Sequence, residues 1–198
     1  LFMKRSTVVI LVVVGVVLVL FFWFKNGYNS MVKEQEGVQT AWSQVENVYQ
    51  RRADLIPNLV NTVKGYAAHE SQTLEGVVNA RAKATQLTVD PENLTPEKLA
   101  AYQEAQGELG AALGKLLAIQ ENYPDLKANE NFLALQSQLE GTENRISTER
   151  MKFNEAAKRY NVLIRVFPKS IIASLFGFEK MPYFQAKEGA DVAPAVEF

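Results

Sequence analysis

The most reactive pair of residues in this sequence is His69 followed by Glu70, because the chain contains one histidine and that histidine has an acidic neighbour. Such a pair suggests a metal ligand or an acid–base couple. A di-metal site in a helical bundle would require Glu-x-x-His motifs on two helices and further carboxylates that point inward. The sequence has no Glu-x-x-His around His69. We therefore predict no metal site and no cofactor, and we assign His69 to a hydrogen bond at the surface or between helices.

Motifs for nucleophilic catalysis and phosphate binding are also missing from the sequence. His69 would be the only base for a catalytic serine, and no Gly-x-Ser-x-Gly turn accompanies it. The lack of cysteine excludes thiol catalysis, thiolate metal sites and disulfides. Neither Gly-x-Gly-x-x-Gly nor a Gly-Lys-Ser/Thr phosphate loop occurs. We predict no catalytic residue and a non-enzymatic protein; the competing hypothesis is a hydrolase whose catalytic residues follow an unfamiliar pattern.

The densest polar cluster consists of Arg51, Arg52 and Asp54, shortly before Pro57. One interpretation is a docking site for anionic lipid headgroups or for a carboxylate of a partner protein. The other is an intramolecular salt-bridge network around the irregularity that the proline creates, with Asp54 as a helix cap. The sequence favours the second interpretation without excluding the first, because most charged pairs are structural or solvated.

Polar residues also interrupt the apolar seam of a long helix that the sequence predicts at residues 128–167. The seam repeats about every 3.5 residues, which is the period of a left-handed coiled coil. Four polar residues lie on or near it: Glu143, Arg150, Asn154 and Asn161. Polar groups there cost stability unless they are paired, so we expect these four to set helix register, with recognition of another helix as the alternative. The aromatic residues of the seam are expected to be core: Phe132, Phe153, Tyr160 and Phe167.

The elements that must position these residues begin with an apolar segment, residues 6–24, which contains no charge. As a helix it would be about 28 Å long, close to the thickness of the hydrocarbon core of a bilayer. Lys4 and Arg5 precede it, and aromatic residues and Lys25 end it, as at membrane interfaces. A cleaved signal peptide is the alternative, but residues 23–28 lack the small-residue cleavage pattern. We predict a retained single-pass anchor in the cytoplasmic (inner) membrane, with the N-terminus in the cytoplasm and the C-terminal domain outside, periplasmic or extracellular.

The residues after the anchor are numerous enough to form one domain with a hydrophobic core. The formal net charge is −1, from 21 Lys and Arg and 22 Asp and Glu, and no basic stripe occurs. We therefore expect no nucleic acid as a partner. The expected partners are the membrane, other envelope or membrane proteins, and a second copy of the chain.

Helical periodicity predicts four helices after the anchor, at residues 28–52, 55–87, 96–120 and 128–167. The Asn-Gly pair within residues 25–28 predicts a bend between the anchor and the first of them. Thr95 followed by Pro96 marks the start of the third helix, as a cap and a proline at the first helical position.

Pro57 leaves two interpretations of the first two helices. Either a new helix begins there with Asp54 as its cap, or one kinked helix runs from residue 28 to about residue 87. We favour the break, because four antiparallel helices cover the apolar face around Trp42. The predicted fold class is therefore all-α: a single N-terminal transmembrane helix, then an antiparallel up-and-down four-helix bundle, then an extended C-terminal tail.

Five large apolar residues follow Pro168 in a segment too short to span a bilayer: Ile171, Ile172, Leu175, Phe176 and Phe178. The segment either docks on the bundle or lies at the lipid interface. Because the last helix of a four-helix path returns toward the anchor, we predict that it lies close to the membrane. Residues 179–198 are predicted to be extended. The predicted domains are 1–27 (N-terminus and anchor), 28–168 (bundle) and 169–198 (apolar segment and tail).

Specific motifs occur together over almost the whole chain after the anchor. The longer ones are AWSQV at 41–45, RRADLIPNLV at 51–60, VKGYA at 63–67, YPDLKAN at 123–129, TENRI at 142–146 and PAVEF at 194–198. The shorter ones are Tyr28-Asn29, His69-Glu70, Ala80-Arg81, Arg150, Phe153-Asn154, Tyr160-Asn161 and Phe167-Pro168. In these residues the chain resembles the LemA family of bacterial membrane-anchored helical proteins.

The resemblance implies an N-terminal anchor and an extracytoplasmic antiparallel helical bundle, and it implies no enzymatic activity. It therefore says more about the fold than about the function. Our leading hypothesis is a non-enzymatic membrane-anchored scaffold or adaptor that acts through helix-mediated protein–protein contacts or self-assembly. The second hypothesis is a regulatory or sensory accessory subunit of a membrane protease or signalling protein.

Overall fold

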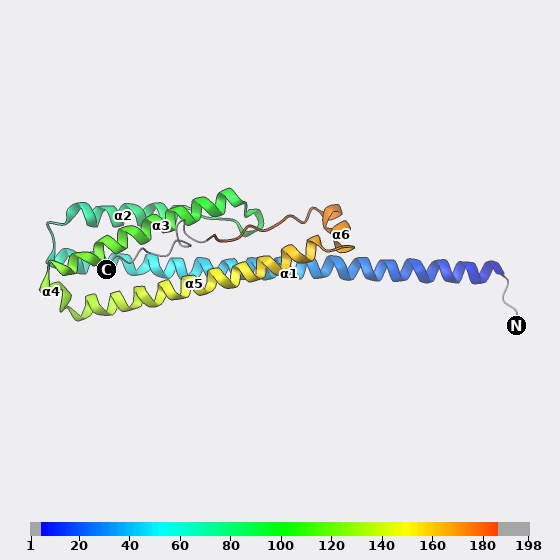
Figure 1. The fold of residues 1–198 in the computed structure, drawn as a ribbon, viewed down its shortest axis with the longest axis horizontal. Coiled ribbons are helices and arrows are strands. Elements are labelled where there is room, and N and C mark those ends of the chain that lie inside the picture. Colours follow the sequence, from blue (N-terminus) through cyan, green and yellow to red (C-terminus); the bar gives the residue numbers. More distant parts are fainter. Residues whose placement is uncertain (1–4, 186–198) are drawn as a thin grey trace, which may run out of the picture. The chain divides into compact units, whose positions relative to one another are not determined.

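Helices form every element in residues 5–185, the part of the chain that the computed structural model describes (Figure 1). The elements are α1 (Arg5–Tyr66), α2 (Ser71–Gln86), η1 (Pro91–Asn93), α3 (Pro96–Ala118), η2 (Ile119–Glu121), α4 (Pro124–Lys127), α5 (Glu130–Arg165) and α6 (Lys169–Phe176). The predicted all-α class with a long N-terminal apolar helix is confirmed. Lys4 and residues 186–198, with the PAVEF motif and most of the tail predicted to be extended, lie outside the described residues.

The predicted start of the third helix is confirmed at the atomic level. Thr95 is the N-cap of α3, because its Oγ1 accepts a hydrogen bond from the backbone N–H of Lys98 at 3.3 Å. Pro96 occupies the first helical position, where its missing N–H leaves no carbonyl unsatisfied. Both features are local, so the sequence alone was sufficient to find them.

Helix α1 continues through two positions at which the sequence predicted an irregularity. The Asn-Gly pair at residues 26–27 lies within the helix, and so does Pro57. The preferred prediction of a new helix at Asp54 is therefore wrong, and Asp54 caps no helix. The alternative of one helix to about residue 87 is also wrong, because α1 ends at Tyr66 and α2 begins at Ser71.

Pro57 is accommodated because a side chain from α2 replaces the hydrogen bond that a proline removes. A proline at this position cannot donate to the carbonyl of Ala53, four residues earlier. Arg81 supplies the missing donor, since its Nε lies 2.8 Å from the Ala53 oxygen. The carbonyl inside α1 is thus satisfied by a residue 28 positions later in the chain.

The end of α1 at Tyr66 follows from packing, since neither glycine nor proline occurs in residues 67–70. The connection is a short turn in which the backbone N–H of Glu70 donates to the Ala67 carbonyl at 3.1 Å. The reversal allows α2 to bury Leu74, Val77 and Ala84. Burial of this face offsets the loss of a continuous helix, because tertiary packing supplies most helical stability in proteins.

The chain divides into two compact units, and the first contains the apolar part of α1. Unit 1 comprises Leu1–Thr40 and Glu155–Met181, which include the first part of α1, the end of α5 and α6. Its buried side chains include Met31, Val38, Ala157, Tyr160, Ile164 and Ile172. An ion pair joins Arg159 Nε of α5 to Glu34 Oε2 of α1 at 3.6 Å on its surface.

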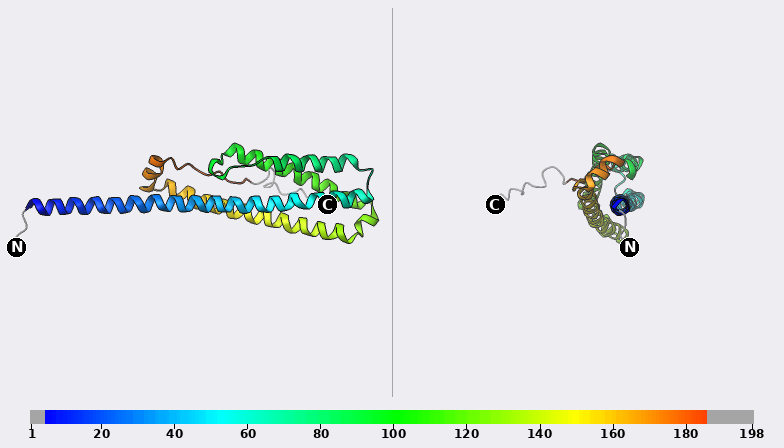
Figure 2. Two further views of the ribbon diagram at one scale, coloured as in Figure 1. Left: turned by 180° about the vertical axis from the view of Figure 1, so that it is seen from behind. Right: turned by 90° about the vertical axis from the view of Figure 1, so that its right-hand side faces the viewer.

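Unit 2, Ala41–Asn154 and Pro182–Phe198, is a helical bundle in the part that the structure describes. The last part of α1, α2, α3 and the first part of α5 surround one core, and α2 and α3 lie side by side (Figure 2). This core includes Ile56, Leu59, Leu74, Val77, Leu109, Leu116, Phe132 and Leu139. An aromatic cluster adjoins it: the Trp42 ring lies 5.3 Å from Tyr102, 5.6 Å from Phe153 and 5.9 Å from Phe184, measured between ring centroids.

The predicted aromatic core of the α5 seam is correct at three positions and wrong at the fourth. Phe132, Phe153 and Tyr160 are fully buried. Phe167, by contrast, is 81% exposed. Because α5 ends at Arg165, the helical register that would have turned Phe167 toward the core does not extend to it.

The first part of α1 is the single helix among the described residues that is long and apolar enough to cross a membrane. Its large apolar side chains between residues 8 and 22 are all exposed, for example Val19 at 69%. A helix that is apolar on all sides and has no protein covering it is typical of contact with lipid. The feature indicates that the chain is anchored to a membrane.

Candidate functional site

The centre of the candidate site is Arg52, a charged residue that is 3% exposed in the core of unit 2. Its Nη1 donates to Glu143 Oε1 at 2.8 Å, and its Nη2 donates to the Gln106 carbonyl oxygen at 3.0 Å. Nη2 also donates to the side-chain oxygen of Gln106. One guanidinium group thus connects α1 to α3 and α5.

The network around Arg52 reaches the remaining helix of the bundle through Gln106, whose Nε2 lies 3.5 Å from the Ala84 oxygen of α2. The Arg52 guanidinium also lies over the Tyr49 ring, 5.0 Å from its centroid. Among the described residues, Arg52 Nε has no hydrogen-bond partner. Burial of a guanidinium is costly unless it is well paired, so these contacts restrict how the four helices can align.

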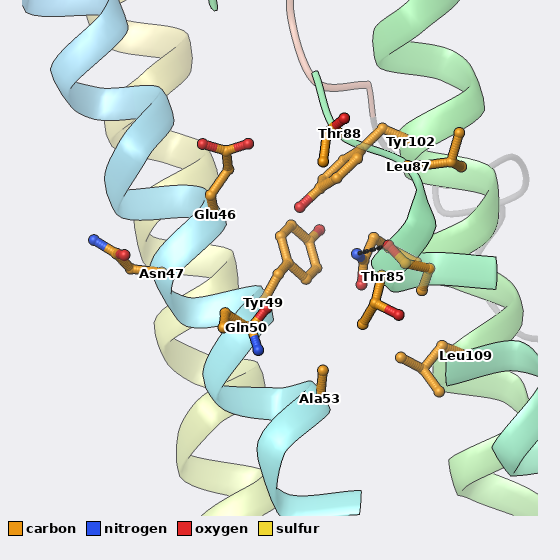
Figure 3. A pocket seen from close by; sticks show the side chains of 12 residues that line it. Glu46, Asn47, Tyr49, Gln50, Ala53, Thr85, Leu87, Thr88, Tyr102 and Leu109 are labelled. Carbon is orange, nitrogen blue, oxygen red and sulfur yellow. Dashed lines mark hydrogen bonds between the residues drawn. The ribbon is translucent and has the colours of Figure 1, made fainter. Parts of the chain in front are cut away.

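A pocket of about 170 Å³ lies on one side of this network, between α1, the end of α2 and α3. Figure 3 shows Tyr49 from α1 and Tyr102 from α3 meeting in the pocket, and their ring centroids are 5.4 Å apart. Glu46 and Thr88 also line it. The pocket combines the two tyrosine rings with the carboxyl group of Glu46 and the hydroxyl groups of Thr85 and Thr88.

Burial shifts the pKa values of these groups. It raises the pKa of Tyr102, and the nearby Tyr49 and Glu46 add to the shift. It also raises the pKa of Tyr49, against the opposing effect of Arg150 and Arg52. Burial raises the pKa of Glu46 as well, although the neighbouring Trp42 side chain opposes the shift. Both phenols are protonated at neutral pH, as ordinary tyrosines are, and burial makes their ionisation still less favourable.

A longer groove lies on the other side of the network, between α3 and α5. Its first part encloses about 750 Å³ and its second part about 540 Å³, and both parts are lined by Gly110 and Glu143. Gly107 and Gly114 continue the α3 wall, and no atom would lie within 4 Å of a side chain's first carbon at either position. The groove is therefore left open where these glycines line α3, while polar residues line both of its sides, for example Gln103 on α3 and Glu143 on α5.

The groove already holds extended backbone at one end, where Gln185 lines it. The Gln185 carbonyl accepts hydrogen bonds from Arg150 Nη2 at 2.9 Å and from Gln103 Nε2 at 3.1 Å. One residue earlier, Asn154 accepts from the backbone N–H of Phe184 at 2.8 Å and donates to its carbonyl at 2.9 Å. The Arg150 guanidinium stacks over the Phe184 ring at 4.8 Å. Side chains of α3 and α5 therefore recognise a main chain directly.

Asn161 repeats this recognition within unit 1. It is 4% exposed, accepts from the backbone N–H of Met181 at 2.9 Å and donates to its carbonyl at 2.8 Å. Each of the two asparagines therefore binds a main-chain N–H and carbonyl within its own unit.

The structure separates the polar cluster that the sequence grouped together. Arg52 is buried, whereas Arg51 and Asp54 are exposed on α1. Asp54 accepts a hydrogen bond from Gln50 Nε2 at 2.7 Å. Arg52 instead pairs with Glu143, which the sequence placed in a different group. Arg150, Asn154 and Asn161 bind the segment after α6 in the contacts described above.

The five apolar residues predicted near the membrane lie in or directly after α6, in unit 1. Ile172 is fully buried, Phe178 is half-buried, and Ile171, Leu175 and Phe176 are exposed. The Phe176 ring lies 5.7 Å from Phe24 and 4.8 Å from Tyr28 of α1. The segment therefore packs beside the end of the apolar part of α1.

Sequence reasoning missed several residues of the site, among them Arg81, Gln103, Gln106 and the hydroxyl group of Tyr102. Gln103 and Gln106 lie three apart on one predicted helix, and glutamine there is ordinary for a solvated face. Ala80-Arg81 was noticed only as a motif. His69 is exposed in the turn before α2, and no group of three or more metal-binding side chains occurs among the described residues.

Comparison with known proteins places these observations in a family. The LemA family model matches residues 41–198. The magnetosome protein MamQ of Magnetospirillum gryphiswaldense is 30% identical over 181 residues, which cover 83% of this chain. MamQ 1 of Paramagnetospirillum magneticum shows the same identity and coverage, and the match spans 66% of the length of each of these two relatives.

A further relative is the protein LemA of Metamycoplasma hominis, which is 24% identical over 170 residues, covering 86% of this chain and 74% of the relative. None of these names designates an enzyme. The resemblance predicted from the motifs is confirmed by the family match and by this relative. The chain therefore belongs to the LemA family.

Proposed function

We propose that this chain is a non-enzymatic, membrane-anchored scaffold whose bundle binds an extended segment of another membrane or envelope protein in the groove between α3 and α5. The observation that carries the proposal is the contact at Gln185. Two side chains from opposite walls of the groove, Gln103 and Arg150, donate to one main-chain carbonyl. A site of this kind recognises backbone, and it therefore suits extended polypeptide more than a small substrate.

The roles of the polar residues support a binding function over catalysis. Arg52, Glu143 and Gln106 pair with each other, and Asn154 binds main chain. Burial makes ionisation of the neighbouring Tyr49 and Tyr102 phenols less favourable still. The chemistry of this region is thus directed to hydrogen bonding between segments of polypeptide.

We also propose that the anchor is retained in the cytoplasmic membrane, with the N-terminus in the cytoplasm and the bundle outside. This topology is supported by the uncharged residues 6–24 and by Lys4 and Arg5 before them. Protease added to intact spheroplasts should digest the bundle. Full protection of the bundle in intact spheroplasts, with digestion after lysis, would reverse the topology.

Photo-crosslinking in living cells tests the groove. A photoreactive amino acid is placed at Ser147, which lines the groove, or at Thr148, the next residue of α5, as the matched control. We expect a discrete product at position 147 that is several-fold weaker at position 148. Mass spectrometry should map it to one short segment of the partner. Gly110→Leu, which fills the groove and has a higher helix propensity than glycine, should abolish the product.

The outcomes separate the candidate functions. A product with another envelope protein that Gly110→Leu removes supports the scaffold. A product with a second copy of this chain would show that the groove serves self-assembly and not the binding of a different protein. A single membrane protease or signalling protein as the partner would favour an accessory subunit. Equal products at positions 147 and 148, unaffected by Gly110→Leu, would show that the groove is not the binding surface.

A further inference from the structure

Unit 1 exposes an apolar surface that has no counterpart in an ordinary soluble domain. Phe167 is 81% exposed, Leu175 68% and Ile171 57%. Ile171 and Leu175 are four residues apart in α6 and share one face of it. Phe167 lies directly before this helix, and Val166 beside it is also exposed. Contiguous exposed apolar side chains of this kind mark an interaction surface.

An adjacent face of α6 is packed against α1 and fixes where this surface lies. Ile172 is fully buried, and a Cβ added to Gly27 would lie only 2.5 Å from its Cδ1. Gly27 thus permits the close approach of α6 to α1. The Phe176 ring contacts Phe24 and Tyr28, with centroid distances of 5.7 and 4.8 Å. These contacts place α6 beside residues 24–28, where the apolar part of α1 ends.

We propose that α6 and Phe167 form an interfacial foot that inserts its apolar face into the boundary between lipid headgroups and acyl chains. The proposal rests on the membrane anchoring of the proposed function. The lipid is identified by continuity, because the exposed face adjoins the end of the segment that is itself apolar on all sides. A helix of eight residues is about 12 Å long, so it can lie in the interface but cannot span the bilayer.

Basic residues around the foot match the phosphate groups of lipids. Lys25 lies within the contact region on α1, Arg165 ends α5, and Lys169 begins α6. Lys25 and Arg165 are exposed, and Lys169 is half-buried. Long basic side chains with apolar stems commonly bridge an apolar surface and the headgroup layer. The foot therefore combines an apolar face with nearby cations, as interfacial helices do.

The sequence of this chain contains no cysteine, which allows a direct measurement of depth. Single variants Leu175→Cys and Lys158→Cys are labelled with an environment-sensitive fluorophore and reconstituted into vesicles of phosphatidylcholine and phosphatidylglycerol. Lys158 is an exposed residue of α5 in unit 1 and serves as the control. We expect blue-shifted emission at position 175 and quenching by lipids with a spin label near the headgroup. Quenching at position 158 should be several-fold weaker.

Two further measurements distinguish the ways in which the proposal can fail. Flotation of the vesicles reports whether the chain is anchored at all. Failure of the anchor is thereby distinguished from failure of the interfacial foot to insert. An anchored chain with equal quenching at both positions would overturn the foot while leaving the anchor intact. If the label at position 175 becomes shielded from lipid quenchers as the protein-to-lipid ratio rises, a second copy covers the face and the lipid assignment is wrong. Circular dichroism confirms that both variants keep their helices.

Discussion

The two units of this chain depart from the usual distribution of polar and apolar residues in opposite directions. Unit 2 buries a charge: Arg52 is 3% exposed and is surrounded by hydrogen-bond acceptors and an aromatic ring. Unit 1 exposes apolar side chains on α1 and around α6. Each departure requires a partner that an ordinary core or surface does not need. In unit 2 the partner is another helix of the same bundle, whereas for unit 1 we propose that it is the membrane.

The comparison shows how the surroundings decide what a residue contributes. A buried guanidinium contributes specificity only when every neighbour is in place, because an unpaired charge in a core is costly. An exposed leucine or phenylalanine costs little when lipid replaces water. Substitutions of matched residues in the two units should therefore have very different effects, and the predictions below run from the largest expected effect to the smallest.

The two tryptophans give the largest contrast. Trp42 is fully buried in the aromatic cluster of unit 2, and we expect Trp42→Ala to destabilise the bundle by about 3–5 kcal/mol. Trp23 is 38% exposed at the end of the apolar segment, and we expect Trp23→Ala to change stability by less than about 0.5 kcal/mol. Urea unfolding in mild detergent, followed by circular dichroism, measures both. Equal midpoints for the two variants would contradict the contrast.

Two ion pairs that differ in burial form the second contrast. Glu143→Ala leaves the buried Arg52 guanidinium without its carboxylate. Because the Glu143 side chain is itself 51% exposed, we expect a loss of about 1–3 kcal/mol, which is less than for a fully buried pair. Glu34→Ala removes the surface pair with Arg159, in which the Arg159 side chain is 61% exposed, and we expect a loss of about 0–1 kcal/mol. Replacing both members of the half-buried pair, Arg52→Met with Glu143→Leu, should recover most of the larger loss. A double variant as unstable as Glu143→Ala would mean that packing, not charge, dominates.

Arg81 and Pro57 test a smaller effect inside unit 2. Arg81→Met leaves the Ala53 carbonyl without a donor, and we expect a loss of about 1–3 kcal/mol. In the background of Pro57→Ala the restored backbone N–H can donate to the same carbonyl, so Arg81→Met should cost less there. A double-mutant cycle measures this coupling. Additive effects would show that Arg81 does not compensate for the proline.

The smallest effect concerns pH. The folded-state pKa of Tyr102 is raised above the ordinary value of 10.0, so the unfolded chain loses this proton first as the pH rises. The stabilising contribution is complete below about pH 10 and decreases above it. Tyr160 in unit 1, whose pKa burial raises to about 12, behaves in the same sense. We expect Tyr102→Phe to leave the pH dependence of unfolding unchanged at neutral pH and to weaken the alkaline loss of stability. An identical alkaline profile for the variant and the parent chain would refute this assignment.

The sequence by itself determined the features that depend on neighbouring residues. The apolar segment at residues 6–24 has the length and composition of a membrane helix whatever lies elsewhere in the chain. Thr95 and Pro96 begin α3 because a cap and an N1 proline act within one turn. The buried stripe that contains Val38, Trp42 and Val45 follows from the helical period. The LemA motifs also lie in short segments, so they could be read directly.

Only the tertiary structure decided the features that join distant residues. The continuity of α1 through Pro57 depends on Arg81 of another helix, and the burial of Arg52 depends on Glu143, 91 positions away. Asn154 and Asn161 bind main chain 30 and 20 residues later, where the sequence suggested contacts between helices. A local sequence pattern indicates helix propensity and helical period, but it does not indicate which distant residue a side chain will contact across the core. That identity appears only when the chain is folded, because a buried polar group takes whichever partner the packing of the helices brings within hydrogen-bonding distance.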